Sequence, residues 1–225
     1  MKKLLTLVSL FTIFSIYSQD TIKKAVGDFT TLKVYNGIDV ELIKSDKQEI
    51  VITGEKAQKV NVKTTRNILK LYLPFPESLA NGKVKIILYY SKDIDIIDAN
   101  EGASITAKEF KQSKVEIKTQ EMAFINMALE VQYLTIKAVT GGAIKLTGST
   151  KNQTIEVNNS GVYRGYNLKV ENTTYIRAAL GGKGEVNSGE TLDAKVSFGG
   201  TIFYKGTPEV LKTKKVLGGI IEVKN

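Results

Sequence analysis

The sequence predicts an all-β protein: a parallel β-helix or β-solenoid with rungs of about 19–20 residues, preceded by a smaller N-terminal β module stacked on it. Three observations predict this fold class. Short alternations of Val, Ile and Leu with polar residues run along the chain, which is the period of a β-strand. The 225 residues include 19 Gly and 3 Pro and contain no convincing amphipathic helix after the first segment. From about residue 99, a Gly- or Ala-containing quartet recurs every 18 to 21 residues, which indicates a solenoid.

Residues 1–18 resemble a cleavable secretory signal. Lys2 and Lys3 precede an apolar stretch over 4–17, and the small residue Ser18 ends it. The stretch is shorter than the roughly 20 residues that span a bilayer. We therefore expect cleavage near Ser18, no retained transmembrane segment, and export to the periplasm, the outer membrane or the cell exterior.

Residues 19–98 are predicted to form the N-terminal β module. Leu32 and Val34 alternate with polar residues, and the pattern resumes at Ile38 after Asn36-Gly37. Both residues of this dipeptide accept a positive φ, so we expect a β-hairpin turn there. Similar alternation continues to Ile96.

Residues 99–225 are predicted to form the C-terminal β-solenoid, and 19–225 one continuous unit. The second residue of each quartet, which we call the anchor, is Ala103, Ala123, Gly142, Gly161, Gly182, Gly200 and Gly219. Positions two and four residues after the anchor, and six and eight before it, are mostly apolar and share one strand face. An antiparallel meander repeats at similar lengths, but in-register apolar columns favour parallel stacking.

Composition narrows the chemistry. The chain carries a formal net charge of +9 and contains neither Cys nor His. Disulfides, thiol nucleophiles, the usual zinc, copper and iron ligand sets, and a His-based catalytic triad are therefore excluded. We expect no cofactor, no metal site and no catalytic residue, and hence a protein that is not an enzyme.

The order of motifs resembles a known family. The segment Phe29–Leu42 is followed by the repeated quartets, then by Tyr204-Lys-Gly206-Thr-Pro208 and finally Gly218-Gly219. This order is similar to the head GIN domain family of putative auto-transporter adhesins, secreted proteins of Bacteroidetes, over about residues 29–221. Gly102-Ala103-Ser104 keeps the family's quartet, whereas Met122-Ala123-Phe124 departs from it. The resemblance implies a two-part β-helical fold and a cell-envelope location, and it carries over no catalytic residue.

The candidate binding residues form one basic column. Five residues before successive anchors stand Lys118, Lys137, Glu156, Arg177, Lys195 and Lys214. Parallel rungs lie about 4.8 Å apart, so these residues are predicted to line one exposed face. One interpretation is a track for an anionic polysaccharide or lipopolysaccharide. The alternative is a set of solvated lysines that discourages edge-to-edge pairing. Nucleic acid is the poorer partner, because no base-stacking motif accompanies the column.

Three other clusters are weaker candidates. Asp93, Asp95 and Asp98, beside Glu101, offer oxygen ligands for calcium but lack the loop glycine of a known motif. A sugar-stacking platform would use Tyr163, Tyr166 and Tyr175 near Arg164 and Arg177, although Tyr163 falls in an inward column. Glu116 and Asp193 share a column four rungs apart, too far to act together in glycoside hydrolysis.

Three functions follow from these observations. The first is a non-enzymatic, adhesin-like binding or scaffolding module of the cell envelope or surface. The second is a carbohydrate-active enzyme, a polysaccharide lyase or hydrolase, on a β-helical scaffold. The third is a structural envelope protein that self-associates into a homo-oligomer through its terminal rungs.

Overall fold

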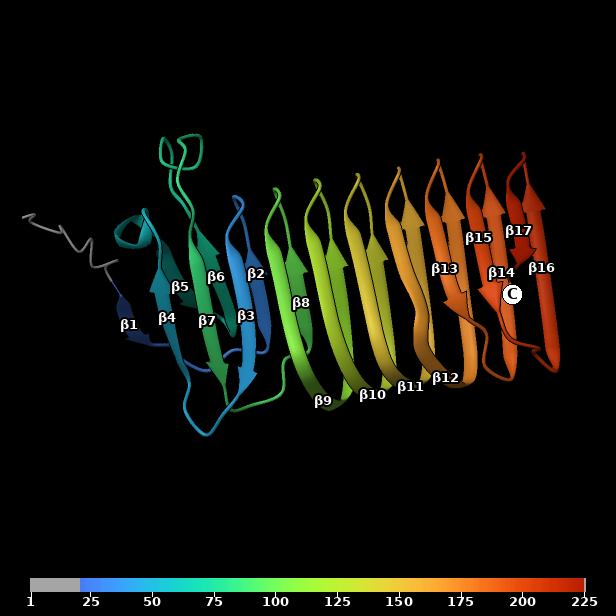
Figure 1. Cartoon of the computed structure of the whole chain (residues 1–225), viewed down its shortest axis with the longest axis horizontal. Helices are drawn as coiled ribbons and strands as arrows, with labels where there is room; N and C mark the ends of the chain where they lie inside the picture. The colour runs from blue at the N-terminus through green and yellow to red at the C-terminus, as the bar shows by residue number, and fades with distance from the viewer. Residues whose placement is uncertain (1–20, 225) are drawn as a thin grey trace, which may run out of the picture.

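The protein is a single elongated stack of β-strands in the computed structural model, which describes residues 21–224 (Figure 1). The strands are β1 (Ile22–Ala25), β2 (Thr31–Val34), β3 (Asp39–Lys44), β4 (Glu49–Thr53), β5 (Asn61–Thr65), β6 (Ile68–Tyr72), β7 (Lys85–Tyr90), β8 (Ile96–Ala99), β9 (Ser104–Thr119), β10 (Phe124–Ala138), β11 (Ala143–Asn158), β12 (Val162–Ala179), β13 (Lys183–Asn187), β14 (Thr191–Ser197), β15 (Thr201–Lys205), β16 (Val210–Val216) and β17 (Ile220–Val223). A 3₁₀ turn, η1, covers Ala57–Lys59. The predicted all-β solenoid is confirmed.

Hydrogen-bonded ladders arrange the strands in two facing sheets. The first sheet runs β5, β6, β2, β8, then the second halves of β9–β12, then β14 and β16. The second sheet runs β1, β4, β7, β3, then the first halves of β9–β12, then β13, β15 and β17. The long strands β9–β12 bend and so belong to both sheets. Pairing is parallel except at β1–β4, β4–β7 and β5–β6.

Two-residue turns connect the sheets along one long edge of the stack (Figure 1). Each turn places two consecutive residues at positive φ, for example Thr140 (49°) and Gly141 (73°). The turn closes through a hydrogen bond from the anchor amide to a carbonyl three residues back, such as Gly161 N to Asn158 O at 2.9 Å. The expected hairpin at Asn36-Gly37 is wrong in one respect. Both φ values are positive, but β2 and β3 diverge into opposite sheets and do not pair with each other.

The predicted inward columns form the core. The anchors from Ala103 to Gly200 are buried, and so are the apolar positions around them, such as Ile125, Ile136 and Ile155. Close approach explains the glycine at the anchor, because a Cβ on Gly161 would lie 2.0 Å from the Ala138 carbonyl oxygen. The last rung differs. Leu211 and Thr213 are exposed, since nothing in the described chain stacks on β16.

The N-terminal module does not follow chain order. The β2–β3 rung lies between the rung of β6 and β7 and the rung of β8 and β9. The module and the solenoid therefore share both sheets. No helix in residues 21–224 is long and apolar enough to cross a membrane. The predicted signal peptide and its cleavage site lie outside the described residues.

Candidate functional site: a basic row on the first sheet

The basic column forms a continuous row across the first sheet. Strand register places Lys118 beside Lys137, Lys137 beside Glu156, and Glu156 beside Arg177. Arg177 then lies beside Lys195, and Lys195 beside Lys214. All six are outside the core, half-buried or exposed. The sequence-predicted residues are thus brought together on one face.

The row continues into the N-terminal module. The spacing of the quartets in the sequence did not predict this extension. Register extends it from Lys118 through Asp98, Lys33, Lys70 and Lys63. The full row contains eight basic and two acidic side chains, and we call these ten residues the basic row.

A sequence signal for part of this extension exists. Lys33 stands five residues before Ile38, which follows the Asn36-Gly37 turn as the anchors follow theirs, and Asp98 stands five residues before Ala103. Lys70 gives no such signal, because its rung closes through a long loop between β6 and β7 instead of a two-residue turn.

Charge along the basic row is unevenly compensated. Glu116, on the neighbouring outward position, forms ion pairs of 3.1 Å with both Lys118 and Lys137. Partial burial alone would raise the pKa of Glu116, but hydrogen bonds from Lys137 and Lys118 lower it below its usual value. Asp98 is buried and pairs with Lys33 at 3.2 Å. These contacts neutralise much of the middle of the row.

The C-terminal end of the row keeps its charge. Within residues 21–224, no ion pair involves Arg177, Lys195 or Lys214. The Arg177 guanidinium instead donates to the Tyr175 hydroxyl and lies 5.1 Å from the centre of its ring. Arg177, Lys195 and Lys214 on β12, β14 and β16 are therefore available to an anion, as are Lys63 and Lys70 on β5 and β6, which form no ion pair within residues 21–224 either.

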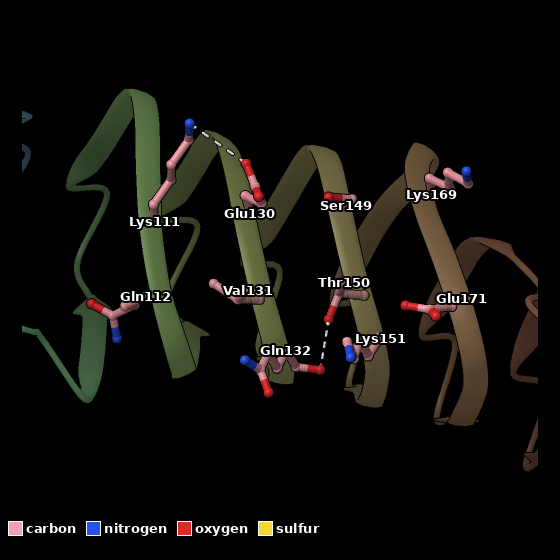
Figure 2. A pocket seen from close by; sticks show the side chains of 10 residues that line it. All are labelled: Lys111, Gln112, Glu130, Val131, Gln132, Ser149, Thr150, Lys151, Lys169 and Glu171. Atoms are coloured by element: carbon pink, nitrogen blue, oxygen red, sulfur yellow. Dashed lines mark hydrogen bonds and ion pairs between the residues drawn. The ribbon is translucent and has the colours of Figure 1, made fainter.

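A shallow groove of about 630 Å³ crosses the bend of β9–β12 (Figure 2). Its upper wall in the figure follows the register Lys111, Glu130, Ser149 and Lys169, and Val131 and Thr150 lie along its middle. Glu130 pairs with Lys111 at 3.5 Å, with about two thirds of its side chain exposed (66%). Glu171 also lines the groove, so its wall carries carboxylates as well as lysines.

The weaker sequence candidates are not assembled into sites. Asp93, Asp95 and Asp98 pair separately with Lys44 (3.5 Å), Lys114 (3.5 Å) and Lys33 (3.2 Å).

The aromatic cluster is likewise dispersed. Tyr163 is buried, Tyr175 lies on the first sheet, and Tyr166 lies beside Lys205 of the second sheet. Glu116 and Asp193 are separated by the intervening strands β10, β11 and β12.

Comparisons with known proteins agree with this architecture. The sequence matches the family model described as "Putative auto-transporter adhesin, head GIN domain" over residues 28–208. A solved putative adhesin from Bacteroides fragilis NCTC 9343 is similar with a TM-score of 0.77 and 19% identity, covering 92% of this chain and 98% of that one. A putative adhesin from Parabacteroides distasonis ATCC 8503 has a TM-score of 0.69 and 20% identity, with 92% and 97% covered.

A third solved structure carries a different description. A putative lipid binding protein from Parabacteroides distasonis ATCC 8503 has a TM-score of 0.66 and 19% identity, with 92% and 97% covered. At these identities the likeness establishes the shared fold. Among curated proteins, none matches this sequence.

Proposed function

The chain belongs to the head GIN domain family of putative auto-transporter adhesins, and from that membership we propose that it is a non-enzymatic binding module of the cell envelope that holds anionic polysaccharide on its basic row. The family supports an adhesin-like role at the surface or in an exported location. The polysaccharide, including the acidic core of lipopolysaccharide, is our inference from charge.

The observation that carries the proposal is the in-register basic row. A parallel stack repeats every 4.8 Å or so, which holds the cations at a fixed spacing along a straight line. Neighbouring like charges in water repel by roughly 1 kcal/mol per pair at 4 Å, and less in salt. A linear polyanion relieves this repulsion at several rungs at once, and its many weak contacts add up through multivalency.

Binding to a polyuronate, with neutral dextran as the comparison, tests the proposal. We expect affinity for the polyuronate at low ionic strength that falls steeply as salt is raised, and no affinity for dextran. The variant Lys118→Glu/Lys137→Glu/Lys195→Glu should weaken binding by about tenfold or more, because it reverses three charges within the row.

A matched control separates the row from overall net charge. Lys108→Glu/Lys145→Glu/Lys205→Glu makes the same change in charge with lysines of β9, β11 and β15 on the second sheet. This control should retain at least half of the affinity. Glu116→Gln should strengthen binding, because it releases Lys118 and Lys137 from their shared partner. Equal losses in the two triple variants would show that net charge, not the row, determines binding.

A further inference from the structure

Three exposed apolar side chains occupy successive turns at the C-terminal end of the stack. Leu180, Phe198 and Leu217 are the first residues of their turns and are 56%, 56% and 71% exposed. Hydrogen bonds and register hold these turns side by side, with Ala179 beside Ser197 and Ser197 beside Val216. We call these three residues the apolar tips. Their turns, between β12 and β13, between β14 and β15, and between β16 and β17, lie along the turn edge of the stack (Figure 1).

The fold does not require apolar residues at these positions. The tips have φ values of 50°, 49° and 53°, a region that non-glycine residues rarely adopt and that Asn tolerates best. Equivalent positions in earlier turns hold Asn36, Glu101, Glu121, Thr140 and Asn159. A large exposed apolar side chain in a strained conformation gains nothing from the core. A contact outside the described chain accounts better for its presence.

Each apolar tip stands three residues after a cation of the basic row. Arg177 precedes Leu180, Lys195 precedes Phe198, and Lys214 precedes Leu217. None of these three cations forms an ion pair within residues 21–224. Where the tips are polar, by contrast, Lys118 and Lys137 share Glu116. In these three rungs, an unpaired cation and an apolar tip therefore occur together.

We propose that this corner of the stack inserts into the surface of an anionic lipid bilayer. The apolar tips enter the boundary between headgroups and acyl chains, as the apolar face of an interfacial anchor does. Arg177, Lys195 and Lys214 lie about 10 Å behind the tips along an extended strand, within reach of headgroup phosphates. Ile220, 42% exposed on the opposite shoulder of the last turn, widens the apolar surface. This contact uses the turn edge and does not depend on polysaccharide binding.

A single tryptophan tests insertion directly, because the chain contains no Trp. Phe198→Trp places the reporter at an apolar tip. Met122→Trp places it at a turn position that is more exposed, 80% at Met122 against 56% at Phe198, and adjacent to Glu121. When the Phe198→Trp variant is mixed with vesicles of phosphatidylcholine and phosphatidylglycerol, its tryptophan fluorescence emission should shift to shorter wavelength. Brominated acyl chains should quench that fluorescence. Met122→Trp should show neither change. No shift for Phe198→Trp, or equal shifts in both variants, overturns the proposal.

Co-sedimentation with the same vesicles supplies the loss-of-function arm. Leu180→Asn/Phe198→Asn/Leu217→Asn should reduce the bound fraction about tenfold while thermal stability stays the same or rises, because Asn accepts the turn conformation. Met122→Asn should bind as wild type does. Pure phosphatidylcholine vesicles should bind the wild-type protein weakly. Unchanged sedimentation of the triple variant contradicts the inference. So does a wild-type dimer that the triple variant dissociates without any vesicle binding, since the tips would then cover a second copy.

Discussion

Removing one hydroxyl from the solenoid interior should destabilise the protein measurably. Tyr163 occupies an inward column and donates from its hydroxyl to the Gln153 Oε1 atom at 3.1 Å. Gln153 donates to the Thr174 hydroxyl at 3.0 Å, and Thr174 donates to the Asn187 carbonyl at 3.0 Å. These side chains are buried, at 0%, 1% and 0% exposure for Tyr163, Gln153 and Thr174. Their hydrogen bonds are therefore made away from water.

Tyr163→Phe keeps the ring and leaves Gln153 Oε1 without its donor. Losing the partner of a buried acceptor costs about 1–3 kcal/mol, and the small volume change adds little to it. Urea denaturation followed by circular dichroism should show a lower midpoint at an unchanged m-value. The double variant Tyr163→Phe/Gln153→Met should recover part of the loss, since it removes both partners. A loss below about 0.5 kcal/mol for Tyr163→Phe would refute the idea that this network stabilises the core.

The pH dependence gives an independent check on the same residue. Burial raises the pKa of Tyr163 above its usual value. The folded state therefore holds this proton more tightly than the unfolded state. The resulting stability is complete below the unfolded pKa, near 10, and is lost progressively as the pH rises above it. Tyr163→Phe should flatten that alkaline decline.

Two further variants test the anchor and the uncovered end of the stack. Gly161→Ala should destabilise the protein by about 1–3 kcal/mol in urea denaturation, because the new Cβ would overlap the Ala138 carbonyl oxygen. Ala123→Gly should cost less stability. Equal denaturation midpoints for Gly161→Ala and wild type would contradict the close-approach argument. Thr213→Val/Lys215→Val should promote association, measured as a higher mass by light scattering. Register places Lys215 over the inward Val196, where a charge discourages a second copy from stacking on β16, and an unchanged mass would argue against that role.

The solenoid rungs were predictable because inward-facing residues alternate along each strand and the turns recur at a nearly constant spacing. Ile117, Ile136 and Ile155 recur at fixed distances from the anchors, so aligning the turns also aligns the core. The N-terminal module lacks this property. The rung of β2 and β3 is separated by residues 45–95 from the rung of β8 and β9, against which it packs. No local sequence pattern specifies this non-sequential order of rungs, because the order depends on which strand edges remain free for pairing.

The candidate site was predictable to the same extent as the fold. Lys118, Lys137, Arg177, Lys195 and Lys214 were found because they share the register of the core. Their ion pairs were not predicted, because Glu116 contacts lysines of two rungs through a side-chain geometry that aligned sequence repeats do not reveal. The groove across the bend was missed for a related reason. Its shape depends on how β9–β12 curve, and residues such as Glu130 and Lys169 show no distinctive spacing.

Core register and surface chemistry are inseparable in this architecture. A shift of one residue in a rung would turn its inward residues outward and would also displace its cation from the basic row. Alternation within a strand therefore places both the buried isoleucines and the exposed cations, and the same rungs carry the turns. The apolar tips follow Arg177, Lys195 and Lys214 by the same three residues in each rung, so any substitution that shifts this register should weaken polysaccharide and bilayer contacts together. Substitutions confined to the apolar tips should weaken the bilayer contact alone, because Arg177, Lys195 and Lys214 serve both contacts.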